Sequence, residues 1–162
     1  MEMLKYKPLY IWWVFLLIVA TGVFWAGYQG FITDIWLKDV TYATSFISAV
    51  FIYGTTIMGY VAWYISNTQN WEPVRHLIRR VWFLSEIEMG VAIIGTSLGL
   101  ILLFNVNSGI NVSDPAALQA LVTHLWSTLG VAFYPNALGL ITSVLLKLMV
   151  FFISEEKKPG TN

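Results

Sequence analysis

The chain has 162 residues, of which 57% are hydrophobic and only 11% are charged, and its formal net charge is zero. Soluble domains carry about 25% charged residues, and a fold of this size could not hide so much apolar surface from water. The zero net charge leaves no basic surface for nucleic acid, and the absence of cysteine excludes disulfides and thiolate chemistry. His76 and His124 have no ligand-like spacing, so we expect no metal, no cofactor and no catalytic centre.

Four hydrophobic segments follow one another along the chain. Each is long enough to cross a bilayer core of about 30 Å, and the many tryptophans and tyrosines suit the two membrane interfaces. The first segment follows two lysines, as in a signal peptide, but it is too long and lacks a small-residue cleavage site, so we expect a retained anchor. The sequence predicts an all-α, polytopic membrane protein with a single membrane domain over 1–162, whose spans are 8–28, 40–65, 81–104 and 124–153.

Basic residues are distributed unevenly between the two sides of the membrane. If four spans alternate in direction, Lys38 lies on one side and the other basic residues outside the spans lie on the opposite side. Cytoplasmic connections are enriched in lysine and arginine, so both termini are expected in the cytoplasm. The residues assigned to the cytoplasmic side are Lys5, Lys7, Arg75, Arg79, Arg80, Lys157 and Lys158.

Small and polar residues share one face in each of the last two spans. Residues three or four apart lie on the same face of a helix, and a G-x-x-x-G pair such as Gly95 and Gly99 lets another helix approach closely. Span four carries a similar stripe among leucine, valine and phenylalanine. The two stripes are Ser85, Met89, Ala92, Thr96 and Gly99 in span three, and Thr128, Ala132, Asn136, Gly139, Ser143 and Lys147 in span four.

The two stripes place polar groups at a similar depth. At a rise of about 1.5 Å per residue, Thr96 lies roughly 20 Å from the cytoplasmic start of span three and Asn136 roughly 15 Å from the outer start of span four. Because the two spans run in opposite directions, both side chains are expected near the midplane. The stripes either line a shared polar interior or form a packing seam between helices, and taken alone they favour packing.

Residues 83–100, with the sequence FLSEIEMGVAIIGTSLGL, resemble the G-T-x-x-G pore helix of the MotA, TolQ and ExbB proton-channel family. Residues 125–148, with the sequence LWSTLGVAFYPNALGLITSVLLKL, resemble the helix that follows it, with its T-A-x-G-L core. The likeness covers the last half of the chain. It implies a bacterial inner-membrane homopentamer around single-span partner helices like those of MotB, TolR or ExbD, whose aspartate carries the proton. The pore-lining residues would be Thr96, Asn136, Ala92, Gly99, Ala132, Gly139 and Ser143.

The chain departs from this pattern in three places. Pro135-Asn136 stands where a threonine-containing pair is expected, and Pro135 should also kink span four, because proline removes a backbone donor. Val131 stands where many relatives carry a glutamate. The connection 66–80 replaces the large cytoplasmic domain of the motor members. These departures favour an alternative function, a non-conducting structural subunit that scaffolds a larger assembly.

A proton path through a membrane generally needs an ionisable group at depth. The middle of each expected span contains no Asp, Glu or His, and the side chains of Thr96 and Asn136 can orient water but cannot carry a proton at neutral pH. The titrating group is therefore expected on another polypeptide. Glu86 and Glu88, in the first turns of span three, are either interfacial charges balanced by the preceding arginines or part of an inner pore mouth.

Overall fold

The computed structural model describes residues 6–39, 41–107 and 115–155, and the elements in these ranges are all helices. Four helical stretches, two of which combine consecutive elements, are long and apolar enough to cross a bilayer: Lys7–Tyr28, Ala43–Thr68, Glu72–Leu102 and Leu129–Ser154. The predicted all-α class is thereby confirmed, together with four helices of membrane-spanning length. In chain order the elements are α2 (Lys7–Tyr28), α3 (Phe31–Lys38), α4 (Ala43–Thr68), the 3-10 turn η1 (Glu72–Val74), α5 (Arg75–Asn107), α6 (Pro115–Ala132) and α7 (Tyr134–Glu155).

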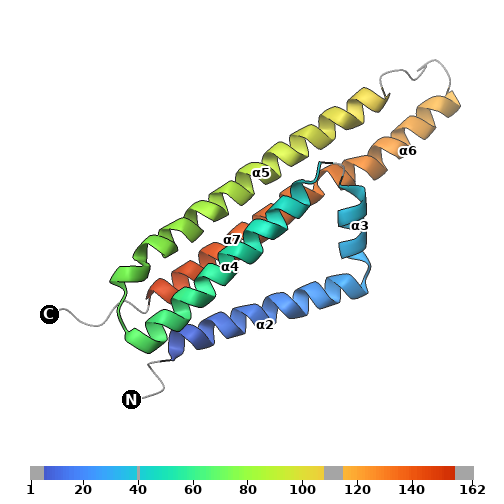
Figure 1. The fold of residues 1–162 in the computed structure, drawn as a ribbon. Coiled ribbons are helices and arrows are strands. Elements are labelled where there is room, and N and C mark those ends of the chain that lie inside the picture. Colours follow the sequence, from blue (N-terminus) through green and yellow to red (C-terminus); the bar gives the residue numbers. More distant parts are fainter. Residues whose placement is uncertain (1–5, 40, 108–114, 156–162) are drawn as a thin grey trace.

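Helices α4, α5 and α7 form the centre of the molecule (Figure 1). Helices α5 and α7 run antiparallel and side by side, α4 packs against both, and α2 leans on α4 at one end while α3 joins them at the other. Apolar side chains from the three central helices fill the space between them, as close packing requires. The buried core consists of Met58, Val61, Ala62, Ile65, Val74, Val81, Leu146, Met149, Val150 and Ile153.

The third span begins earlier than its hydropathy predicts. Helix α5 starts at Arg75, directly after η1, whose Pro73 suits a first helical turn. It has 33 residues and is therefore about 50 Å long, well beyond the roughly 30 Å of a bilayer core. Val74 and Val81 are both buried in the core, so packing against α4 and α7 continues the helix into its charged first turns.

The fourth span is made of two helices, because the chain leaves the helical path at Phe133. Pro135 has no N–H to donate to the carbonyl group one turn earlier. Two residues before it, the Phe133 N–H bonds to the carbonyl oxygen of Gly130, three positions earlier, at 3.3 Å. The helix is therefore interrupted at Phe133, two residues before the proline at which the sequence predicts a kink. Helix α6 begins at Pro115, nine residues before the expected start of span four at residue 124.

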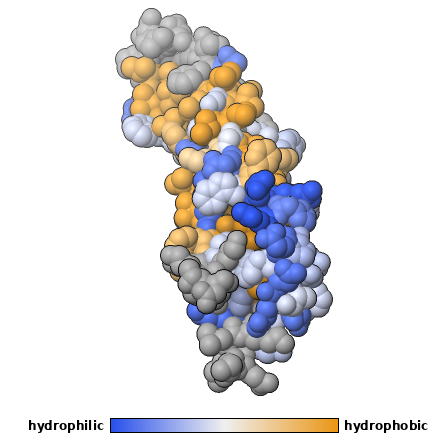
Figure 2. Space-filling view, turned by 90° about the vertical axis from the view of Figure 1, so that its left-hand side faces the viewer, coloured by the Kyte–Doolittle hydropathy of each residue, from blue (hydrophilic) through white to orange (hydrophobic). Residues whose placement is uncertain are grey.

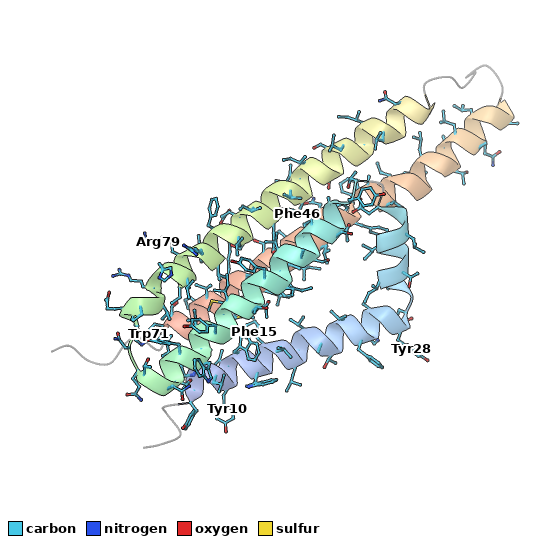
Figure 3. All side chains as sticks on the ribbon, viewed as in Figure 1. Tyr10, Phe15, Tyr28, Phe46, Trp71 and Arg79 are labelled. Atoms are coloured by element: carbon cyan, nitrogen blue, oxygen red, sulfur yellow. The ribbon has the colours of Figure 1, made fainter. Side chains whose placement is uncertain are left out.

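Charged and interfacial residues gather at one end of the bundle, where α4 passes into α5. Arg75, Arg79 and Arg80 are exposed there, and α2 begins and α7 ends at the same end (Figure 1). Figure 2 views the molecule from this side, with hydrophilic residues in its lower half and hydrophobic residues above. Figure 3 places Trp71 at this end and Tyr28 at the far end of α2. Lys5, Lys157 and Lys158 lie outside the described residues, and the cytoplasmic assignment of this end stays a prediction.

Asp39 closes the turn that precedes α4. Its carboxylate accepts hydrogen bonds from the Thr41 N–H at 2.9 Å, the Thr41 hydroxyl at 2.5 Å and the Thr44 N–H at 2.7 Å. Desolvation by burial acts to raise the pKa of Asp39, but the hydrogen bonds from Thr41 and Thr44 outweigh it and lower the pKa from its usual 3.8. The side chain therefore accepts, as an anion, one free N–H group in the first turn of α4, that of Thr44.

Candidate functional site

The small-residue faces of α5 and α7 meet each other inside a single chain. A Cβ added to Gly139 would collide with the Ala92 Cβ and lie 3.0 Å from the Glu88 carbonyl oxygen. A Cβ on Gly99 would lie 3.2 Å from the Ala132 Cβ. Such approaches require small residues on both helices. We call this contact the α5–α7 seam, and its members are Ser85, Glu88, Ala92, Thr96, Gly99, Ala132, Gly139, Thr142 and Ser143.

Gly95 brings three helices together at the level of the kink. A Cβ at this position would lie 2.5 Å from the Ala43 Cβ at the start of α4 and 3.3 Å from the Pro135 Cβ on α7. Because Gly95 and Pro135 are in contact, their neighbours Thr96 and Asn136 lie at one level of the bundle. The helical rise predicts such a shared level, and the depth of this level in a membrane stays a prediction.

Thr96 and Asn136 differ in exposure. The Thr96 side chain is 8% exposed, and its hydroxyl donates to the Ala92 carbonyl oxygen at 3.0 Å. The Asn136 side chain is half-buried. By contrast, the neighbouring Ser97 makes the same kind of bond, to the Ile93 carbonyl oxygen at 2.9 Å, on an exposed face. Of these three polar groups, Thr96 is turned most completely toward protein.

Glu86 and Glu88, which the sequence placed together, lie in different surroundings. Glu86 is half exposed, and a carboxylate oxygen lies 2.7 Å from the Lys147 ammonium group of α7. That ammonium group also lies 5.4 Å from the centre of the Trp82 ring, within the range of a cation–π contact. An ion pair thus links α5 and α7 at the partly exposed edge of their contact.

Glu88 is fully buried in the seam. Both of its carboxyl oxygens lack a hydrogen-bond partner among the described residues. The Thr142 hydroxyl lies beside the carboxyl group without completing a hydrogen bond to it. Because α5 begins at Arg75, Glu88 lies about 20 Å along the helix and near the middle of the candidate span Glu72–Leu102, whereas the expected span 81–104 has it in its first turns.

The buried stripe of α5 runs through Glu88 and not through Met89. Steps of three or four residues from Ser85 to Ala92 can pass through either position, and the stripe predicted from the sequence contains Met89. In the structure Met89 is 38% exposed and Glu88 is 0% exposed. The spacing of Ser85, Glu88 and Ala92 was the signal that could have located this carboxyl group.

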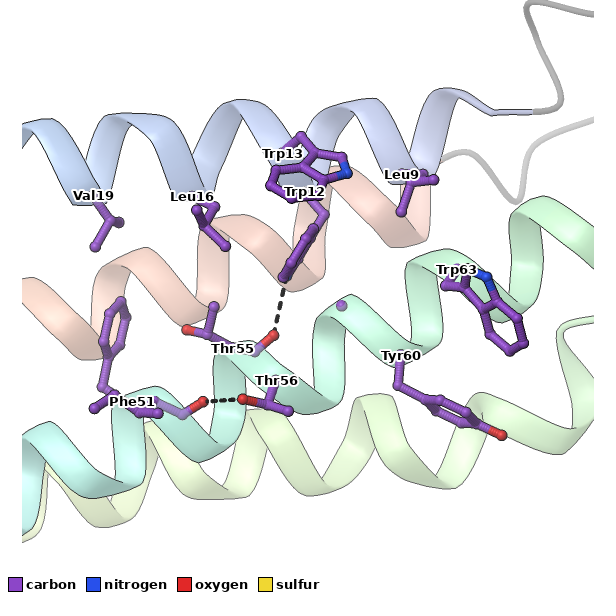
Figure 4. A pocket seen from close by; sticks show the side chains of 12 residues that line it. Leu9, Trp12, Trp13, Leu16, Val19, Phe51, Thr55, Thr56, Tyr60 and Trp63 are labelled. Carbon is purple, nitrogen blue, oxygen red and sulfur yellow. Dashed lines mark hydrogen bonds between the residues drawn. The ribbon is translucent and has the colours of Figure 1, made fainter.

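A second feature is a groove between α2 and α4, with a volume of about 880 Å³ (Figure 4). Aromatic and aliphatic side chains line most of it. The Trp12 indole N–H donates to the Thr55 carbonyl oxygen at 3.1 Å, and a Cβ on Gly59 would lie 2.7 Å from the Trp12 ring. The lining carries no charged side chain, so the groove suits hydrocarbon and offers no group for acid–base chemistry.

Within the described ranges, no three His, Asp or Glu side chains gather where they could hold a metal ion. No protein-family model, curated protein or solved structure matches the chain. The likeness to MotA, TolQ and ExbB therefore stays a prediction from residues 83–100 and 125–148.

Proposed function

We propose that the chain is a proton-handling subunit of an ion-driven membrane motor or energiser complex of the MotA, TolQ and ExbB type. In this proposal, copies assemble as a homopentamer in a bacterial inner membrane, around single-span partner helices that carry a titrating aspartate. The observation that carries the proposal is the shared level of Thr96 and Asn136 on two antiparallel central helices, α5 and α7. Polar residues in membrane helices generally face protein or water and mark ion pathways.

The two polar groups have suitable chemistry for this role. A threonine hydroxyl both donates and accepts, and an asparagine amide does the same with separate atoms, so the pair can orient water molecules or a partner's carboxylate. The ion pair of Glu86 and Lys147 joins α5 to α7 nearer the arginine-rich end. A proton crossing such a complex would release about 2.3 kcal/mol per 100 mV of membrane potential, which is the energy available for work.

A second function is favoured by the tightness of the α5–α7 seam. Gly139 meets Ala92 so closely that the two helices of one chain leave no room for a pore between them at this level. Such rigid packing suits a non-conducting subunit that scaffolds a larger membrane assembly. A conducting path would then have to lie between copies or between a copy and a partner.

The two functions differ in what they expect of a double variant, Thr96→Val and Asn136→Leu. The complex is purified with its bound partners and reconstituted into vesicles, and proton uptake is followed under an imposed potential. If the two groups assist the proton, uptake falls by about ten-fold or more, because a hydrogen bond to a charged group is worth about 1.5–3 kcal/mol. The matched control is Ser97→Ala, which removes a hydroxyl from the exposed face of the same helix and should leave uptake unchanged.

Uptake that is unchanged in the double variant would support the scaffold function. Imaging of the same complex gives an independent answer, because it counts the copies and shows whether density fills the centre of the ring. A monomer, or a ring with a solid apolar centre, would refute the channel proposal.

A further inference from the structure

The Glu88 side chain is fully buried between three helices. Its own helix continues with Ala92, and α7 contributes Gly139 and Thr142. Ile47 of α4 packs against the same place, since a Cβ on Gly139 would lie 3.4 Å from the Ile47 Cδ1 atom. Because Gly139 has no side chain, α7 approaches the Glu88 backbone directly, and the carboxyl group is enclosed where the two helices are closest.

Among the described residues, no positive charge is placed to compensate a carboxylate at this position. Helix α4 has no charged residue, and α2 has one only at its first position. On α7, Lys147 is bound to Glu86 at 2.7 Å on the outer edge of the helix pair. On α5, the nearest arginines, Arg79 and Arg80, are exposed and lie more than two helical turns closer to the N-terminus of the helix.

The Thr142 hydroxyl beside the Glu88 carboxyl group offers no proton to a carboxylate. Thr142 has one O–H group, which donates to the Leu138 carbonyl oxygen at 3.0 Å, with the Gly139 carbonyl oxygen at 3.4 Å. The Thr142 oxygen can therefore only accept a further hydrogen bond. A carboxylic acid can donate to such an oxygen, whereas a carboxylate can only accept.

We propose that Glu88 is a proton-binding site of this chain and that the proton is bound while α5 and α7 are packed as observed. A buried carboxylate without a cation or a donor is strongly unfavourable, whereas the neutral acid is tolerated among apolar and small groups. The proton is released only when the helices separate enough to admit water or a cation. The inference goes beyond the proposed function, because it concerns one chain and needs neither a pore nor a partner.

Infrared spectroscopy of the full chain in lipid bilayers tests this proposal directly. A protonated carboxyl group gives a carbonyl-stretch band that an ionised carboxylate lacks. At neutral pH the wild-type protein should show this band, and the band should shift only slowly after transfer to D₂O, because the group is shielded from water.

Two variants assign the band. Glu88→Gln keeps the size and neutrality of the acid, and it should remove the band without loss of helical content. Glu86→Gln is the matched control on the same helix, and the band should persist in it. The proposal is overturned if the wild-type protein lacks the band, or if the band survives in Glu88→Gln.

The wild-type measurement stands even if Glu88→Gln does not fold. In that case, the proposal is supported if the carbonyl-stretch band of the wild type shifts slowly in D₂O and if Glu86→Gln shows the same band with the same slow shift. A shift completed at once on transfer to D₂O would show an acid in contact with water, and it would overturn the proposal equally.

Discussion

Replacing Gly139 with alanine adds one methyl group where α4, α5 and α7 come together. The new Cβ would lie 3.4 Å from the Ile47 Cδ1 atom, 3.0 Å from the Glu88 carbonyl oxygen, and still closer to the Ala92 Cβ. The isoleucine can adjust its rotamer. A backbone oxygen and an alanine methyl group cannot move independently of their helix, so α5 and α7 must separate to make room.

The size of the effect follows from two opposed contributions. Overpacking a well-packed interior costs about 1–3 kcal/mol, and the upper end applies here because two of the three neighbours are fixed to the α5 backbone. Alanine is favoured over glycine in a helix interior by about 1 kcal/mol. Gly139→Ala should therefore lower the free energy of unfolding by about 2 kcal/mol, which is roughly a 30-fold change in the ratio of folded to unfolded protein.

Reversible unfolding in mixed detergent micelles, followed by circular dichroism, measures this difference. The control is Gly90→Ala, also in a central helix, where an added Cβ would meet nothing within 4 Å. It gains only the helix propensity and should be as stable as the wild type or slightly more stable. If Gly139→Ala is as stable as Gly90→Ala, the close contact is refuted, and Gly139 instead faces open space, as a pore-lining residue would.

Three further changes test other contacts. Asp39→Asn should destabilise the protein by about 1–2 kcal/mol at neutral pH. Because the pKa of Asp39 is lowered in the folded chain, the stability that its carboxylate contributes is fully present above a pH of 3.8 and is lost as the pH falls through the lower pKa of the folded state. The free energies of unfolding of variant and wild type should therefore converge in acid. Trp12→Phe removes the donor to the Thr55 carbonyl oxygen and should cost about 1 kcal/mol in the unfolding assay; no loss would argue against this contact between α2 and α4. A double-mutant cycle of Glu86→Gln and Lys147→Met should give a coupling energy of about 1 kcal/mol or more, whereas a value near zero would mean that water screens the pair.

The four long helices could be predicted from sequence because span length and apolar composition are local properties. The first two expected spans, 8–28 and 40–65, lie close to α2 (Lys7–Tyr28) and α4 (Ala43–Thr68). The early start of α5 could not be predicted in this way. It depends on the burial of Val74 against other helices, and hydropathy along one segment does not contain that information.

The composition of the α5–α7 seam was only partly predictable. Helical spacing identified Ala92, Thr96 and Gly139 as members of small or polar faces, but spacing assigns a residue to a face and does not name the helix it meets. At the step between Ser85 and Ala92, Glu88 and Met89 satisfy the spacing equally well. The contact with α7 decides between them, and it depends on a glycine more than forty positions away in the chain.

Burial of Glu88 and the close contact at Gly139 are two aspects of one arrangement. A charged Glu88 needs water or a cation, and neither fits while Gly139 lies against Ala92 and the Glu88 backbone. Proton release and helix separation are therefore linked, and any change that opens the seam should also favour the carboxylate. Gly139→Ala opens the seam by design, so the infrared band assigned to Glu88 should weaken in this variant at neutral pH. A band of full strength in a measurably destabilised Gly139→Ala would show that packing and protonation are independent.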